Sequence, residues 1–182
     1  PCLLSVPLLA HGAEIAGETI TLTLPQLHWV LEFGAPGFVL REKEVVESKE
    51  ATRFFAVNAK TGMVMSAFLE KADHPGDSKE CRAFYWERGK KSPTRKDDFS
   101  MSESGGMAIL EYIVQETEGV KVNQKNMNVY LSRDGYWGDI HLSKVKLNAG
   151  EEKLFKEVLG KVRFRPKAAL SDRPAPRHYG LP

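Results

Sequence analysis

The sequence predicts an α+β fold in which an antiparallel β-sheet is flanked by helices. Three observations lead to this class: strand-like alternation between residues 18 and 145, a strong hairpin signal at Asp134-Gly135, and an amphipathic helix pattern from Asn148 onward. A chain of 182 residues that is 42% apolar and 27% charged is long enough to bury a full core. We therefore expect a single domain over residues 16–165, an N-terminal arm over 1–15 and an extended tail over 166–182.

The first half of the chain reads mainly as strands. In "ETITLTLP", Ile20, Leu22 and Leu24 alternate with threonines until Pro25. "HWVLEFG" and "GFVLREKEVVE" follow, separated by glycine and proline. "RFFAVNAKTGMVMSAFLEKA" predicts a hairpin whose loop spans residues 58–62. Apolar residues occupy both registers of that hairpin, which predicts that both of its faces are covered.

A helix is predicted over residues 78–91, because Asp77 and Glu80 have the spacing of a capping box. The polar stretch "PTRKDDFSMSESGG" that follows has no apolar period and predicts a loop or a weak edge strand. "MAILEYIVQE" is apolar on both sides, which is typical of a central strand.

The stretch "NVYLSRDGYWGDIHLSK", residues 128–144, predicts a hairpin with a two-residue turn at Asp134-Gly135. In that register, paired residue numbers sum to 269. One side of the hairpin is an apolar ladder in which Val129 faces Ile140. Because side chains alternate along a strand, the other side carries a shared row of polar and aromatic residues: Asn128, Tyr130, Ser132, Trp137, Asp139 and His141.

The clearest helix is "NAGEEKLFKEVLGKVRF", with Asn148 as N-cap, Glu151 closing a capping box, and cations at its end. Its apolar stripe should lie on the sheet, where each buried side chain contributes roughly 1.5–3 kcal/mol before entropy is subtracted. The stripe consists of Leu154, Phe155, Val158, Leu159 and Val162.

The distribution of charge along the chain and the composition of its two terminal segments indicate which kinds of partner and which compartment to expect. Residues 161–182 carry a net charge of +5 and leave −3 for the rest, so the folded part has no basic footprint for nucleic acid. The tail is either solvated or a linear motif that docks on a partner. The apolar start "CLLSVPLLAHGAEIAG" resembles the second half of a secretory signal peptide, which predicts export to the periplasm or outside; it otherwise reads as an N-terminal strand. This stretch is too short to span a bilayer, and we expect no transmembrane segment.

No strong catalytic motif is present. The sequence contains no GxGxxG, GxxxxGK[ST], GxSxG or HExxH pattern, and its two cysteines, Cys2 and Cys81, form no CxxC pair. Asp139 and His141 could share one proton-transfer partner or one metal ion. A hydrogen-bonded polar face, with Tyr130 contacting Asp139 and Asn128 contacting His141, explains the same residues without any ligand.

A family resemblance rests on the order "ECRAFYW", "MAILEYIV", the aromatic hairpin and "LFKEVLGKVRF". This order resembles the PsbP-like superfamily over residues 18–164, a group that includes an extrinsic photosystem II protein and a Ran-binding nuclear-transport factor. The resemblance implies a three-layer α/β/α sandwich and a scaffold that mostly binds proteins. It carries no functional residue onto a recognisable motif of this chain.

We therefore expect a non-catalytic binding or assembly module that uses no cofactor. Its candidate binding residues are those of the hairpin face, which hold a protein partner or a small ligand: Asn128, Tyr130, Trp137, Asp139 and His141. The alternative is a small metal-dependent or Asp–His hydrolase centred on Asp139 and His141.

Overall fold

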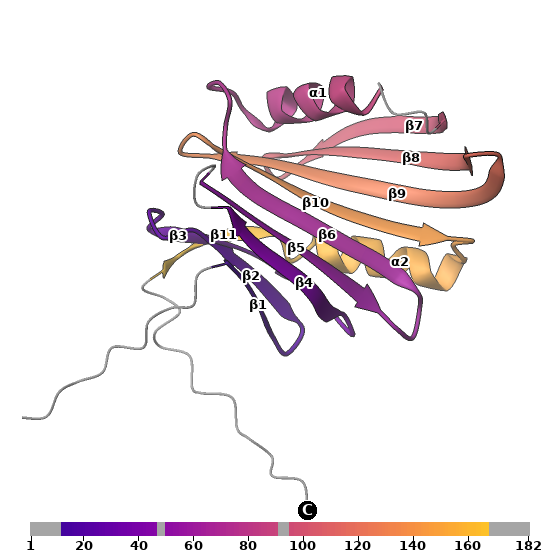
Figure 1. Ribbon diagram of the computed structural model, residues 1–182, viewed down its shortest axis with the longest axis horizontal. Helices are drawn as coiled ribbons and strands as arrows, with labels where there is room; N and C mark the ends of the chain where they lie inside the picture. Colours follow the sequence, from indigo (N-terminus) through magenta and orange to yellow (C-terminus); the bar gives the residue numbers. More distant parts are fainter. Residues whose placement is uncertain (1–11, 47–49, 91–94, 168–182) are drawn as a thin grey trace, which may run out of the picture.

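The structure of the chain is a computed structural model that describes residues 12–46, 50–90 and 95–167 (Figure 1). In chain order the elements are β1 (Gly12–Ala16), β2 (Thr19–Thr23), β3 (Trp29–Gly34), β4 (Val39–Val46), β5 (Ala51–Asn58), β6 (Met63–Lys71), α1 (Ser78–Gly89), β7 (Arg95–Ser104), β8 (Met107–Thr117), β9 (Val120–Arg133), β10 (Tyr136–Val145), α2 (Ala149–Leu159) and β11 (Arg163–Pro166). No helix in these ranges is both long and apolar enough to cross a membrane.

The strands form two antiparallel sheets. The large sheet has seven strands in the order β4-β5-β6-β10-β9-β8-β7, and the small sheet has four in the order β1-β2-β3-β11. Figure 1 shows α1 along the β7–β8 end of the large sheet, with the small sheet at the opposite end. The expected antiparallel sheet is therefore confirmed.

The expected α+β class with a three-layer α/β/α sandwich is wrong, because the described residues are mostly antiparallel strands in two sheets, with two helices. One face of the large sheet packs against α1, but its other face is covered by the small sheet together with α2. The physical reason is that β1, β2 and β3 pair with one another instead of joining the large sheet, and β11 extends them. A second sheet with an apolar inner face therefore fills the layer that the resemblance assigned to helices.

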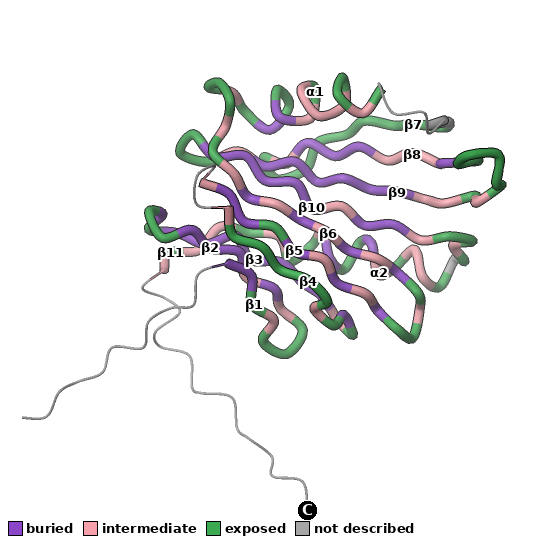
Figure 2. Tube along the Cα trace, in the orientation of Figure 1, coloured by how far each residue is buried: buried purple, intermediate pink, exposed green. Residues whose placement is uncertain are grey.

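The main core lies between the two sheets and under α2 (Figure 2). Leu31 of β3, Ile140 of β10 and Val158 of α2 are all fully buried there. The two sheets approach closely, because a Cβ added at Gly138 of β10 would lie 3.2 Å from Leu31. A smaller cluster lies on the opposite face beneath α1, where Cys81, Tyr130 and Trp137 are buried.

The hairpin at β9 and β10 has the predicted register. Val129 pairs with Ile140, Tyr130 with Asp139 and Asn128 with His141, so each pair sums to 269. Asp134 and Gly135 both have positive φ, at 51° and 77°, as a turn of this type requires. The apolar ladder faces the main core, and the polar row faces α1.

Both helices begin where the sequence predicted. Asp77 caps α1 and Asn148 caps α2, each with its complete capping box. The second helix ends earlier than predicted, at Leu159, with Gly160 as C-cap. Val162 therefore lies beyond the helix, although it still packs on the main core, and the next residues form the edge strand β11.

Three other predictions concern the edges of the fold. The polar stretch after α1 is the edge strand β7, which was one of its two predicted alternatives. Gly12–Ala16 forms β1, and Ala13 is buried. The preceding residues 1–11, on which most of the signal-peptide prediction rests, and the tail at 168–182 lie outside the described residues.

Candidate functional site

The five predicted site residues lie together on the α1 side of the large sheet. Tyr130 and Asn128 come from β9, and Trp137, Asp139 and His141 from the neighbouring strand β10. Alternation along these two strands places them on one face, as the sequence predicted. The structure thus brings all five together.

Four of the five are buried. Trp137 is 1% exposed, Tyr130 3%, and Asn128 and Asp139 8% each, while His141 is partly exposed. The cover is α1: the ring of Phe84 lies 5.3 Å from that of Trp137. Tyr85 stacks parallel to Tyr130 at 6.2 Å. A ligand could reach most of this face only if α1 moved.

The Asp139 carboxyl is the most unusual group in the site. Both of its oxygens accept hydrogen bonds from Asn128 Nδ2, at 3.0 and 2.8 Å. Burial raises the pKa of this carboxyl to about 7, while the bonds from Asn128 act in the opposite direction. Asp139 therefore titrates close to neutral pH, and its side-chain hydrogen-bond partner among the described residues is a neutral amide.

His141 has a separate amide partner. Its Nε2 lies 3.0 Å from Oδ1 of Asn126, and burial lowers the pKa of the imidazole to about 4. The ring is therefore neutral at pH 7 and its Nε2–H donates to Asn126. This pairing differs from the predicted one, because Asn128 bonds diagonally to Asp139 and leaves His141 to Asn126.

These contacts bear on the hydrolase alternative. Asp139 and His141 each bond to an asparagine, so the carboxylate does not orient the imidazole as it would in a catalytic pair. In the described part of the chain, no group of three or more His, Cys, Asp or Glu side chains could hold a metal ion. The geometry gives the alternative no specific support.

The groups around Asp139 remain protonated at neutral pH. Burial is the largest cause that raises the pKa of Tyr112 to about 12, and nearby Asp139 contributes. The pKa values of Tyr130 and Cys81 are raised for the same two reasons. The covered face is consequently a buried polar patch in which Asp139 is the group that titrates near neutral pH.

An open groove continues this face beyond α1. Phe68 of β6 lies opposite Asp139, and Arg53 of β5 lies opposite Phe68, so all three share one side of the sheet. Tyr85 and Arg88 of α1 form the other wall, and the groove encloses about 780 Å³. We call it the α1 groove and define it by Arg53, Phe68, Glu70, Tyr85 and Arg88.

The lining of the α1 groove is partly aromatic and partly charged. The rings of Phe68 and Tyr85 lie 4.9 Å apart. The Tyr85 hydroxyl donates to Glu70, whose other oxygen lies 3.8 Å from Arg53. The Arg88 guanidinium lies 4.3 Å above the Phe84 ring.

The sequence analysis missed this groove. Apolar residues on both registers of β5 and β6 predicted that both faces were covered, yet Phe55, Val64 and Phe68 are only partly buried. The usable signal was Arg53 and Glu70, charged residues in the same register as Phe68. Tyr85 and Arg88 share one side of α1 through their spacing of three residues.

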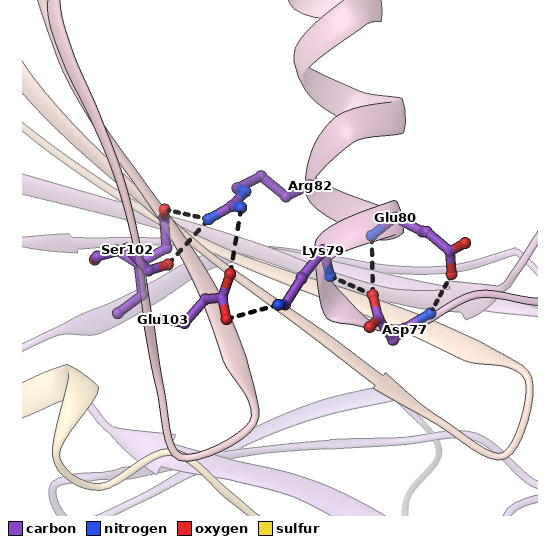
Figure 3. Close-up of polar contacts among 7 residues, drawn as sticks. Asp77, Lys79, Glu80, Arg82, Ser102 and Glu103 are labelled. Atoms are coloured by element: carbon purple, nitrogen blue, oxygen red, sulfur yellow. Dashed lines mark hydrogen bonds and ion pairs between the residues drawn. The ribbon is translucent and has the colours of Figure 1, made fainter.

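A second open cavity, of about 720 Å³, lies at the N-terminus of α1. Figure 3 shows that Lys79, which lines this cavity, and the nearby Arg82 of α1 both reach the Glu103 carboxylate: Lys79 Nζ lies 2.9 Å and Arg82 Nη2 3.8 Å from it. Arg82 also donates to the backbone oxygens of Ser102 and Ile109. These contacts fasten α1 to β7 and β8.

No protein-family model and no curated protein sequence matches this chain. The resemblance to the PsbP-like superfamily therefore stays a prediction from the sequence. The function proposed next depends on the geometry of the large sheet's α1 side.

Proposed function

We propose that this protein is a non-catalytic binding module that holds a small amphipathic anion in the α1 groove. The observation that carries the proposal is the groove itself, which Arg53 and Phe68 of the sheet line together with Tyr85 and Arg88 of α1. Its volume lies within the range of small-ligand sites, roughly 300–1,000 Å³.

The charges in the groove favour an anion at one place. Lys71 Nζ lies 2.5 Å from Glu50, so these two charges neutralise each other. Glu70 is likewise engaged by Tyr85 and Arg53. Within the described residues Arg88 has no carboxylate partner, and its guanidinium can donate a pair of hydrogen bonds to a planar carboxylate.

The aromatic lining of the α1 groove favours an aromatic body in the ligand. The rings of Phe68 and Tyr85 are tilted by 56° to each other, so such a body can pack against either ring, and an aromatic pair is worth about 0.5–1.5 kcal/mol beyond its buried area. Asp73 also lines the groove and repels ligands with a second negative charge. An aromatic monocarboxylate therefore fits better than a dianion.

The test uses benzoate, phenylacetate and indole-3-acetate, with the matching neutral amides as controls, and isothermal titration as the readout. Arg88→Gln should weaken carboxylate binding by roughly tenfold to a hundredfold, because a charge-assisted hydrogen bond contributes about 1.5–3 kcal/mol. Arg41→Gln, an exposed arginine of β4 outside the α1 groove, is the matched control and should change nothing. Equal effects of the two variants, or no preference for carboxylate over amide, would contradict the proposal.

A further inference from the structure

A buried carboxyl group, that of Asp139, lies where α1 packs on the large sheet. Asp139 is a carboxylic acid in the middle of an antiparallel sheet, buried on the face that α1 covers and close enough to Cys81 of α1 to raise the pKa of that thiol. The Cys81 thiol lies 4.0 Å from the carbonyl oxygen of Gly138, the residue next to Asp139. The first turns of α1 therefore pack directly beside this acid.

We propose that α1 is a pH-sensitive lid: it stays on the sheet face while the Asp139 carboxyl is neutral, and it lifts when that carboxyl ionises. The lid does not depend on the ligand proposed above, since it rests on contacts within the chain.

The first support is the small core on the α1 side of the sheet. Only Ser78 and Cys81 of the twelve residues of α1 are buried. Among the described residues, five buried residues, Cys81 of α1 included, form the cluster on this side, against twenty-five in the main core between the two sheets. Because burial of apolar surface is the main force that holds packed layers together, lifting α1 should disrupt a smaller core than separating the two sheets would.

The second support is that the attachment is uneven along the helix. Lys79 and Arg82, in the N-terminal half, are tied to β7 and β8 by ion pairs and by bonds to backbone oxygens (Figure 3). The C-terminal half is held by ring contacts of Phe84, Tyr85 and Trp86 and by the hydrogen bond from the Tyr85 hydroxyl to Glu70 of β6. The lid should therefore pivot about its first turn and open at its C-terminal half.

The third support is the electrostatic environment of the acid. No cation of the described residues pairs with Asp139, so its charged form has only Asn128 to replace water. Opening would return the carboxylate to water and restore an ordinary pKa. The polar and titratable groups that face this cluster are Cys81 and Tyr85 from α1, Tyr112 from β8, Asn128 and Tyr130 from β9, His141 from β10 and Glu70 from β6.

The other titratable groups near Asp139 whose pKa values are shifted do not change charge between pH 6 and pH 8. The pKa values of Cys81, Tyr85 and Tyr130 are all raised from values already above 8, and that of Tyr112 is about 12. His141, with a pKa of about 4, is already neutral at pH 6. Asp139 is thus the group of this cluster that changes charge in the window.

Hydrogen exchange measured by mass spectrometry tests the lid in the full chain, with rates corrected for the pH dependence of chemical exchange. Protection of residues 84–89 should fall about tenfold from pH 6 to pH 8. In the open state the Asp139 carboxyl ionises with an ordinary pKa, whereas in the closed state its pKa is about 7, so a rise in pH across this window favours the open state. Asp139→Asn cannot ionise and should show no such fall. The helix α2, on the opposite face, serves as the internal control and should stay protected at both values.

Three results would overturn the lid. Residues 84–89 could keep the same protection at both pH values, Asp139→Asn could respond as the wild type does, or α2 could lose protection in parallel, which would mean global unfolding. A second measurement does not require Asp139→Asn to fold: the carboxyl carbon of Asp139 is titrated by NMR in the wild type. A midpoint near pH 7 that coincides with the change in α1 supports the lid, and a midpoint below pH 5 contradicts it.

Discussion

Asp139 and His141 oppose each other in the pH dependence of stability. The folded-state pKa of Asp139 is raised from 3.8 to about 7, so stability is full below pH 4 and is lost as the pH rises toward 7. That of His141 is lowered from 6.5 to about 4, so its stability is present above pH 6.5 and is lost as the pH falls. The two effects overlap between pH 4 and 6.5 and largely cancel.

Replacing His141 should reveal the contribution of its imidazole to the pH dependence of stability. His141→Gln removes a group that takes up a proton on unfolding, so the variant should gain stability relative to wild type as the pH falls from 6.5 to 4. The pKa shift corresponds to roughly 3 kcal/mol, and we expect about 1–2 kcal/mol because the ring keeps some contact with water. Urea unfolding at pH 7 and pH 4.5 measures the gain. An equal stability difference at both pH values would show that His141 does not titrate as described.

For single residues of the β9–β10 hairpin, the sequence predicted which side chains share a face of the sheet but not which of them form hydrogen bonds with each other. The hairpin register follows from local turn chemistry at Asp134 and Gly135, and it was right. The partners depend on rotamers: Asn128 reaches diagonally to Asp139, and His141 turns to Asn126. Nothing in the alternation of a strand distinguishes the direct from the diagonal neighbour.

Helix α1 is held by two kinds of polar contact that differ in strength. The Lys79–Glu103 pair joins two half-exposed side chains and contributes little. The Arg82 side chain is only 13% exposed and donates to oxygens of both β7 and β8. Arg82 therefore fixes the edge of the large sheet to the helix.

We expect Arg82→Ala to lower the free energy of unfolding by about 1–3 kcal/mol, because it leaves two carbonyl oxygens without their donor. Lys79→Ala, one turn earlier on the same helix and paired with the same carboxylate, should cost less than about 0.5 kcal/mol. Urea unfolding followed by circular dichroism compares the two. The reverse order would show that the exposed ion pair, and not the bonds to backbone, fastens α1.

The starts of elements were predictable and some of their ends were not. Capping boxes at Asp77 and Asn148 are local sequence signals, and both occur as predicted. The end of α2 depended on competition between continued helix and pairing of Arg163–Pro166 with β3. Gly160 permitted either outcome, and only the position of the small sheet decided it.

As a whole molecule, the protein is two sheets that share one core. Leu31 of β3 packs against β10, and Trp29 Nε1 donates to Asp134 Oδ2 in the β9–β10 turn at 2.8 Å. The two sheets should therefore unfold in one cooperative transition. The sequence predicted the apolar ladder of β9 and β10 that faces this core, but it predicted a single sheet between helices and not that the first three strands form their own sheet, because that choice depends on pairing between distant segments.

Leu31→Ala tests the shared core. Removing this buried side chain should cost about 2–5 kcal/mol and lower the protection of slowly exchanging amides in β2 and β9 by the same free energy. Val120→Ala, at a position that is 63% exposed, is the control and should change either value by less than about 0.5 kcal/mol. Loss of protection confined to β2 and β3 would show that the small sheet unfolds by itself.

The most direct test of the central claim is an amide-resolved NMR titration of the full chain with indole-3-acetate. If the α1 side of the large sheet is the functional surface, chemical-shift changes should gather at residues 68–71 and 85–88, on the two walls of the α1 groove. They should be absent from β1, β2 and β3. Changes centred on the small sheet, or no saturable change anywhere, would contradict this account.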